Sequence, residues 1–163
     1  MVGIGFDIHR LVKGRLLLLG GVRIKYPRGL LGHSDGDVLL HAICDALLGA
    51  AGLGDIGDYF PDTDPRLSFT GWWLPKGSDS TIFVRDALKR ITRKGYKISH
   101  LDTIIFAEAP KLYRLKDKIR QRVAGLLKVA IKQVNIKAKT FEGLGVVGKK
   151  QAIAALVVVM LNK

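Results

Sequence analysis

Three residues in the first part of the chain carry side chains that commonly bind metal ions. Asp7 and His9 stand one residue apart, and His41 follows in a stretch with apolar residues at helical spacing. Alternate side chains of an extended strand point to the same side, so Asp7 and His9 could share one ion, with His41 as the candidate third ligand. Three oxygen and nitrogen ligands leave one corner of a zinc tetrahedron open for a substrate. The pattern predicts a catalytic zinc centre.

The alternative is that this pattern is accidental. An Asp-x-His sequence is common, and a lone histidine in a helix is more often packed or solvated than bound to metal. Clustering favours the metal interpretation, because His9, His33 and His41 are three of the four histidines. We expect the fourth, His100, at the surface. Asp45, four residues after the helical histidine, either orients it or forms an ordinary surface pair.

The composition indicates a single domain over residues 1–163, with 48% hydrophobic and 25% charged residues. Its single cysteine, Cys44, excludes an internal disulfide and a CxxC zinc clip, and it is consistent with a reducing compartment. The longest apolar run, 152–161, is about half as long as a membrane-spanning helix. We expect no membrane partner, no targeting peptide and a cytoplasmic location, or the plastid stroma after removal of a transit peptide.

The charge is strongly positive, because 27 Lys and Arg residues against 14 Asp and Glu residues give a net charge of +13. Such a field attracts phosphates or nucleic acid. A nucleic-acid interface would more typically add exposed aromatics for stacking or a recognition helix, and neither motif is found. We therefore favour a small polyphosphate substrate and no nucleic-acid partner. The alternative is a non-catalytic basic protein that binds RNA or another polyanion.

The elements that must position these residues follow an α+β order. Alternating patterns and glycine turns predict strands at 2–12, 15–19, 22–24, 98–107, 134–140 and 151–161, the last of them buried. Helical spacing predicts helices at 37–49, 111–131 and from Ser78 or Asp79 to Lys94, with Ser34 or Asp35 capping the first. The many turn-forming and acidic residues in 54–65 predict a structured loop there. The expected fold is α+β, a single-layer mixed β-sheet with helices packed on one face.

Several longer stretches together closely resemble the 2-C-methyl-D-erythritol 2,4-cyclodiphosphate synthase family. They are Gly-Phe-Asp-Ile-His at 5–9, Gly-Leu-Leu-Gly-His-Ser-Asp-Gly-Asp at 29–37 with His41, Gly-Asp-Ile-Gly at 54–57, Phe-Pro-Asp-Thr-Asp at 60–64, Ala-Pro-Lys at 109–111, and Asn-Ile-Lys-Ala-Lys-Thr-Phe-Glu at 135–142 followed by Leu-Gly at 144–145. The resemblance implies a homotrimer with active sites between adjacent subunits. The implied enzyme is a phosphorus–oxygen lyase that converts 4-diphosphocytidyl-2-C-methyl-D-erythritol 2-phosphate to 2-C-methyl-D-erythritol 2,4-cyclodiphosphate and releases CMP.

The resemblance also implies two metal ions. Asp7, His9 and His41 would hold Zn²⁺, which would act as a Lewis acid on the β-phosphate of the substrate. Glu142 would hold a second divalent cation, Mg²⁺ or Mn²⁺, through the substrate phosphates. The attacking 2-phosphate is already ionised, so catalysis would rest on positioning and charge neutralisation. Without the resemblance, Glu142 would be a surface acid in a basic segment.

The other site residues are carried over from the same resemblance. His33 and Thr140 are expected to be catalytic, because they correspond to residues that orient or stabilise the transferring phosphate; their alternative roles are turn capping and strand packing. Substrate contacts are expected from Asp7, His9, His33, Ser34, Asp55, Ile56, Gly57, Phe60, Pro61, Asp62, Thr63, Asp64, Ala107, Ala109, Pro110, Lys111, Lys139, Thr140, Glu142 and Lys149. Among these, Asp55 would contact the erythritol hydroxyls, and residues 107–111 would form the pocket for the cytidine of the diphosphate-linked substrate.

The chain departs from the family pattern in two regions. Val146, Lys149 and Gln151 stand where the family commonly has phenylalanine, arginine and an acid near the central channel of the trimer, which argues against a prenyl diphosphate site there. An apparent insertion also carries the adjacent Trp72 and Trp73. These two rings either cover the active site or a neighbouring subunit, or pack into a local core.

Overall fold

The computed structural model describes residues 1–61 and 75–163, which form a mixed α+β fold, as expected. The elements are β1 (Val2–Lys13), β2 (Leu17–Leu19), β3 (Val22–Ile24), β4 (Arg28–Leu30), α1 (Val38–Ala50), α2 (Ile56–Tyr59), α3 (Thr81–Arg93), β5 (Lys97–Phe106), the 3₁₀ helix η2 (Tyr113–Leu115), α4 (Lys116–Leu127), the 3₁₀ helix η3 (Ile131–Gln133), β6 (Val134–Lys139), α5 (Gly145–Gly148) and β7 (Ala152–Asn162). In this described part, no helix has the length and apolar character needed to cross a membrane.

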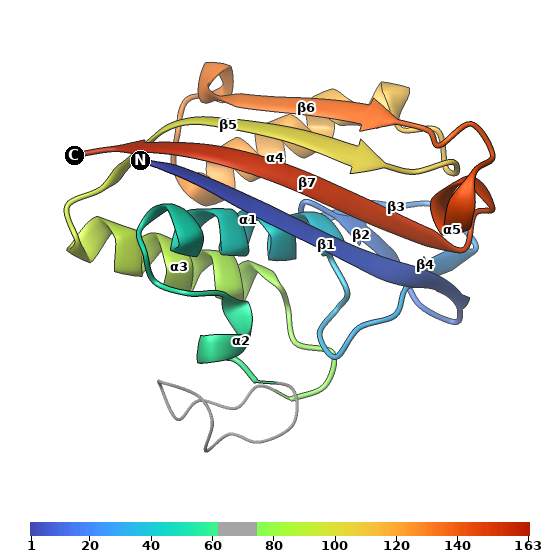
Figure 1. Ribbon diagram of the computed structural model, residues 1–163. Coiled ribbons are helices and arrows are strands. Elements are labelled where there is room, and N and C mark those ends of the chain that lie inside the picture. The colour runs from blue at the N-terminus through green and yellow to red at the C-terminus, as the bar shows by residue number, and fades with distance from the viewer. Residues whose placement is uncertain (62–74) are drawn as a thin grey trace.

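One mixed sheet organises the fold, with strand order β4-β1-β7-β5-β6. β7 pairs antiparallel with both β1 and β5, whereas β5 and β6 are parallel. A parallel pair needs a crossover connection, and α4 supplies it. Helices α1, α3 and α4 lie on the same side of the sheet (Figure 1), where they enclose the core together with the β2–β3 hairpin. The predicted arrangement of helices on one face of a mixed sheet is confirmed.

Strand β1 comes unusually close to α1 because it presents a glycine to the helix. A Cβ atom on Gly5 would lie only 1.9 Å from the carbonyl oxygen of Ala42, so a larger residue would push the helix away. Asp7 and His9 continue the same face of the strand toward its C-terminal end. The close packing of β1 on α1 therefore places these two side chains beside the helix that carries His41.

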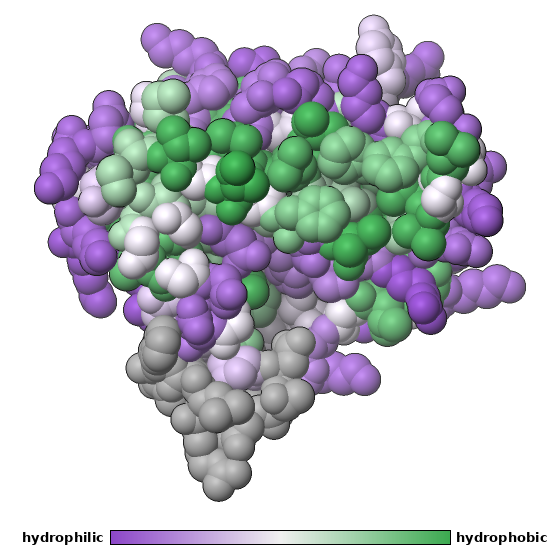
Figure 2. Space-filling view, in the orientation of Figure 1, coloured by the Kyte–Doolittle hydropathy of each residue, from purple (hydrophilic) through white to green (hydrophobic). Residues whose placement is uncertain are grey.

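The other face of the sheet is apolar and exposed. On β1 the exposed fraction lies between 43% and 66% for Val2, Ile4, Phe6 and Ile8, and Met160 on β7 is 50% exposed. Figure 2 shows apolar side chains gathered across this face of the sheet. A patch of this kind marks an interaction surface. The prediction that the last strand is buried is therefore wrong only for this face of its C-terminal half, at Val158 and Met160.

Three helix starts differ from the prediction. The N-cap of α1 is Asp37 rather than Ser34 or Asp35, because the Asp37 carboxylate accepts a hydrogen bond from the Leu40 backbone N–H. The N-cap of α3 is Ser80, two residues after Ser78 and one after Asp79, the predicted alternatives. The helix predicted over 111–131 begins only at Lys116, after η2, and ends at Leu127.

Three short elements were not predicted. A helical turn, α2, lies within the segment predicted as a loop, and reciprocal hydrogen bonds between Asp55 and Asp58 cap it. The edge strand β4 and the helical turn α5 contain three and four residues. Segments this short carry almost no periodic signal, so they form only where the rest of the fold supports them.

Candidate metal centre and its cavity

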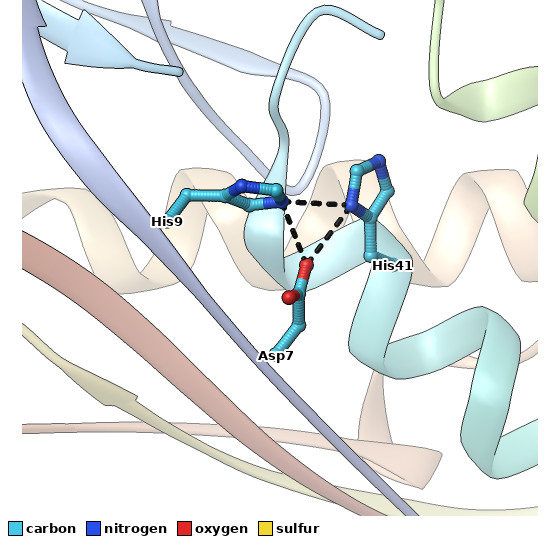
Figure 3. Close-up of side chains that lie close together, drawn as sticks. All are labelled: Asp7, His9 and His41. Atoms are coloured by element: carbon cyan, nitrogen blue, oxygen red, sulfur yellow. Dashed lines mark hydrogen bonds and ion pairs between the residues drawn. The ribbon is translucent and has the colours of Figure 1, made fainter. Parts of the chain in front are cut away.

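The three predicted metal ligands meet at one point. Asp7 and His9 extend from β1, and His41 faces them from the first turns of α1 (Figure 3). The Asp7 Oδ2 atom lies 2.8 Å from His9 Nε2 and 2.9 Å from His41 Nδ1, and the two nitrogens are 3.0 Å apart. The structure therefore confirms that these three residues form a group able to hold a metal ion.

The geometry of this group fits a tetrahedral ion. Zinc bonds of about 2.0–2.1 Å at tetrahedral angles place neighbouring ligand atoms about 3.3 Å apart, and the three observed distances are only a few tenths of an ångström shorter. One carboxylate and two imidazoles also match the ligand types of catalytic zinc sites, which keep a fourth position open. The donor set suits a catalytic metal better than a closed structural one.

The side chains of the group stabilise each other's charges. Partial burial by itself raises the pKa of Asp7, but hydrogen bonds and charge interactions with His41 and His9 outweigh it and hold that pKa well below its usual range. Burial by itself lowers the pKa of His9, but its hydrogen bond with Asp7 raises the pKa above the ordinary value. The carboxylate thus stays ionised, and a cation bound there would replace the proton on the imidazole.

A second set of side chains holds His41 in place. The hydroxyl oxygens of Ser34 and Ser80 each lie 2.9 Å from His41 Nε2, on the side of the ring that faces away from Asp7. The Ser80 hydroxyl also donates to the Asp35 carboxylate, and Ser80 itself is fully buried. Sequence reasoning missed Ser80 and Asp35, because 45 residues separate them and no local pattern joins them.

Asp45 and Phe83 lie next to the same histidine. The Asp45 carboxylate accepts a hydrogen bond from the Ile56 backbone N–H, so it fixes the start of α2, a role that neither alternative from the sequence included. Burial raises the pKa of this carboxyl group. The Phe83 ring packs edge-on against the His41 imidazole with 5.6 Å between centroids. Together they close two sides of the space in front of the metal ligands.

That space is a cavity of about 210 Å³. Besides the metal group, it is lined by five residues predicted as substrate contacts: His33, Ser34, Ile56, Phe60 and Pro61. His33 Nε2 is buried and has no hydrogen-bond partner among the described residues. A buried polar atom without a partner is costly, so a ligand group in the cavity would be a natural partner for it.

Several predicted residues do not line this cavity. Gly57 belongs to α2, and Asp55 is the N-cap of this helix, so its carboxylate is engaged in capping. Lys149 is exposed at the end of α5. Asp62, Thr63, Asp64 and the two tryptophans of the apparent insertion lie outside the described residues. His100 is exposed, as predicted.

A second cavity, of about 170 Å³, collects part of the residues predicted for the nucleotide. Ala107, Lys111, Lys139 and Thr140 all line it. The neighbouring Ala109 and Pro110 are joined by a cis peptide bond and are half-buried. The Thr140 hydroxyl donates to the Glu142 carboxylate, and Glu142 is exposed.

The two cavities belong to different parts of the sheet. The metal group stands on β1, whereas the second cavity lies where β5 and β6 end, and β7 and β5 separate β1 from β6. Three strand spacings amount to about 14 Å. Among the described residues, none lines both cavities. Within one chain, the structure therefore does not bring Thr140 and Glu142 to the metal group.

The fold and this site together define a small α+β protein with a metal-ligand group that opens into a cavity. The chain belongs to the YgbB family, whose sequence model matches residues 1–162. The resemblance inferred from the motifs is confirmed.

Individual relatives agree with this assignment. The chain is 52% identical over 162 residues to a protein of Bordetella avium named 2-C-methyl-D-erythritol 2,4-cyclodiphosphate synthase, and the match covers 99% of this chain and 95% of that protein. It is also 52% identical to a bifunctional IspD/IspF enzyme of Albidiferax ferrireducens, of which it spans 37%. A structure of 2C-methyl-D-erythritol-2,4-cyclodiphosphate synthase in its CDP-bound form superposes with a TM-score of 0.86 at 37% identity, over 99% of this chain and all of that one.

Proposed function

We propose that this protein is a phosphorus–oxygen lyase that converts 4-diphosphocytidyl-2-C-methyl-D-erythritol 2-phosphate to 2-C-methyl-D-erythritol 2,4-cyclodiphosphate and releases CMP. The observation that carries the proposal is the Asp7, His9 and His41 triangle beside a cavity, in a chain so similar to named synthases. The non-catalytic polyanion-binding alternative is not favoured, because it gives this group and cavity no role. A cytoplasmic location stays a prediction.

Asp7, His9 and His41 would hold Zn²⁺, whose Lewis acidity would polarise a phosphate oxygen of the substrate. The residues of the chain would do the positioning. Ser34 and Ser80 hold the His41 ring, so the ligand group is arranged before substrate arrives. Such preorganisation lowers the cost of charge movement in phosphoryl transfer.

His33 is the residue we propose for contact with the transferring phosphate. Its unpartnered Nε2 atom would donate to a phosphate oxygen and thereby gain the hydrogen bond that it lacks. Ile56, Phe60 and Pro61 line the same cavity and would exclude water around the methylerythritol group. Asp55 remains the proposed contact of the erythritol hydroxyls, although its carboxylate caps α2 in the structure.

The nucleotide half of the substrate would occupy the second cavity. Lys111 and Lys139 line it and would neutralise the diphosphate, while residues 107–110 would surround the cytidine. Thr140 would stabilise the transferring phosphate, and Glu142 would hold Mg²⁺ or Mn²⁺ through the phosphates, since carboxylate oxygens are the ligands these ions prefer. The CDP in the related structure supports a cytidine-linked substrate.

We further propose a homotrimer whose active sites each combine the metal cavity of one subunit with the nucleotide cavity of the next. Two observations support it. The two cavities are separated within one chain, and the exposed apolar face of the sheet provides a surface for association. Metal ligands and nucleotide contacts would then converge only in the assembly.

The test is release of CMP from the cytidyl substrate, with phosphorus NMR of the second product, for protein loaded with zinc and Mg²⁺ and for protein stripped by a chelator. We expect CMP and a cyclic diphosphate only with metal. His41→Ala should lose both bound zinc and turnover, because two ligands hold the ion poorly. His100→Ala is the matched control at an exposed histidine and should retain both. Turnover by the zinc-free protein would contradict the proposal.

A further inference from the structure

The helical side of the molecule carries a groove between α3 and α4 that the proposed reaction does not use. It has a volume of about 950 Å³ and is open to solvent rather than enclosed. Leu88, Ile98, Leu126 and Val129 are among the side chains that form its apolar floor. None of its lining residues lines the metal cavity or the nucleotide cavity. The groove is therefore a separate surface feature.

Among the residues that the structure describes, six basic side chains surround this floor and no acidic side chain lines the groove. They are Arg85, Lys89, Arg93, Lys97, Arg122 and Lys128. Three of them recur every four residues along one face of α3, so they form a continuous row. In the part of the chain that the structure describes, none of the six side chains makes an ion pair or a hydrogen bond.

This arrangement is unfavourable in the isolated protein. Like charges four residues apart on a helix repel each other by a few tenths of a kcal/mol per pair. Elsewhere on the same helix a basic side chain is paired with an acidic one, because Arg90 forms an ion pair with Asp86 outside the groove. A groove with an apolar floor, a cationic rim and no internal counter-charge is complementary to a partner with the opposite pattern.

The apolar floor of the groove distinguishes between the possible classes of anionic partner. A free phosphate would use only the rim, and at an open surface salt would screen it strongly. Single-stranded nucleic acid binds through aromatic stacking platforms. Tyr96 supplies the one aromatic ring among the described residues that line the groove, and the Lys163 ammonium group stands 6.0 Å from its centroid. An amphipathic helix would cover the leucine floor and place acidic side chains against the rim.

We propose that the α3–α4 groove binds an acidic amphipathic helix of a partner protein. α3 contains 13 residues and is about 20 Å long, so a bound helix of three to four turns would span the groove. The apolar contacts would supply affinity, and the cationic rim would supply orientation and a fast association rate.

The proposal is tested by selecting a displayed library of peptides about 15 residues long against the metal-loaded protein at physiological salt. We expect enrichment of acidic peptides with apolar residues three and four positions apart. The selected peptides are then synthesised, and their affinity is measured by fluorescence anisotropy. The double variant Lys89→Glu/Arg93→Glu should bind them about tenfold more weakly or worse.

The matched control is Lys13→Glu/Lys25→Glu, which changes the net charge equally at exposed sites outside the groove. It should bind within about twofold of the wild type, because the rim is intact. Leu88→Gln should also weaken binding by removing part of the floor. All three variants should release CMP at the wild-type rate, which shows that they are folded and separates this test from that of the catalytic function.

Three results would overturn the proposal. The first is selection of no peptide that distinguishes the wild type from the rim variant. The second is equal affinity for a peptide of the same composition with its apolar residues distributed around the helix, since that would show attraction by charge alone. The third is a single-stranded RNA of about 15 nucleotides that displaces the peptides and loses more affinity in the rim variant, which would make the groove a nucleic-acid interface.

Discussion

His41 connects the metal group to the interior of the protein through its two ring nitrogens. Nδ1 faces the Asp7 carboxylate, and Nε2 faces the hydroxyls of Ser34 and Ser80. A metal on Nδ1 requires the proton on Nε2, and the Nε2–H group can then donate a hydrogen bond to the Ser80 hydroxyl, which itself donates to the Asp35 carboxylate. This chain of hydrogen bonds fixes both the tautomer and the orientation of the ligand.

Ser80→Ala should therefore weaken metal binding without removing a ligand. We expect a loss of about 10- to 100-fold in zinc affinity, because the ring loses a partner that fixes its orientation. Affinity is measured by competition with a chromophoric chelator, and circular dichroism checks the fold. Ser99→Ala, on β5, is the control and should bind zinc as the wild type does. Unchanged zinc affinity in Ser80→Ala would show that Ser34 alone is sufficient to orient the His41 ring.

At the scale of elements, Asp37 joins the start of α1 to the β2–β3 turn. Its carboxylate accepts hydrogen bonds from the backbone N–H groups of Leu40, Gly20 and Gly21, although it is fully buried. Burial raises the pKa of this group, while the three donors oppose the shift. One side chain thus holds the hairpin against the helix that carries a metal ligand.

Asp37→Ala should lower the free energy of unfolding by about 3 kcal/mol, because it removes a helix cap and leaves buried N–H donors unpaired. Urea denaturation measures the loss. Asp79→Ala is the control, since the Asp79 carboxylate accepts from Thr81 N–H at an exposed position. It should cost less than about 1 kcal/mol. Equal costs for both variants would contradict the role assigned to the buried carboxylate.

An ion pair between Asp102 on β5 and Lys137 on β6 should make the stability of the protein depend slightly on pH. Slight burial by itself raises the pKa of Asp102, but hydrogen bonds from Lys137 and Asn135 outweigh it and lower the pKa below the ordinary value of 3.8. A depressed pKa stabilises the fold at pH values above the unfolded pKa, and this contribution is lost as the pH falls through the folded pKa.

Asp102→Asn should therefore destabilise the protein near neutral pH and have no such effect at about pH 2. The pair is exposed and screened by solvent, so the expected loss is less than about 1 kcal/mol. Urea midpoints at the two pH values measure it. The control is the same Asp102→Asn change in a Lys137→Met background, because the ion pair is already removed there and the change should show little dependence on pH. A loss that persisted at acid pH would show a packing effect instead.

At the scale of the whole molecule, the exposed apolar face of the sheet is the surface through which we propose that the subunits associate. Ile4 lies in this face and is 66% exposed in the single chain. Ile4→Glu should disrupt the proposed trimer, because association would bury an unpaired charge. Light scattering after size exclusion should show a trimer for the wild type and a monomer for the variant.

The monomer should bind zinc, since one chain supplies all three ligands, but it should release no CMP, since the nucleotide cavity would come from a neighbour. Gln121→Glu, exposed on the helical side, is the control and should remain a fully active trimer. An active Ile4→Glu monomer would contradict the intersubunit site.

Local patterns predicted the parts of this protein that depend on local geometry. The alternation of a strand places Asp7 and His9 on one side, and helical spacing places His41 near the start of a helix; both hold in the structure. Strands β1, β5, β6 and β7 were found within one or two residues. The short β4 and α5 were not, because they carry no usable period and lack the Gly-Gly turn that marks the equally short β2 and β3.

Tertiary structure alone decided how these elements meet. The sequence shows which residues share a strand face, but only the packing of β1 on α1 makes one face a metal group and leaves the other an exposed apolar surface. The support of His41 by Ser80 and Asp35, and the separation of the two cavities, join residues far apart in the chain. Periodicity is a property of neighbours along the backbone, whereas a site is formed by segments that become neighbours only when the core excludes water.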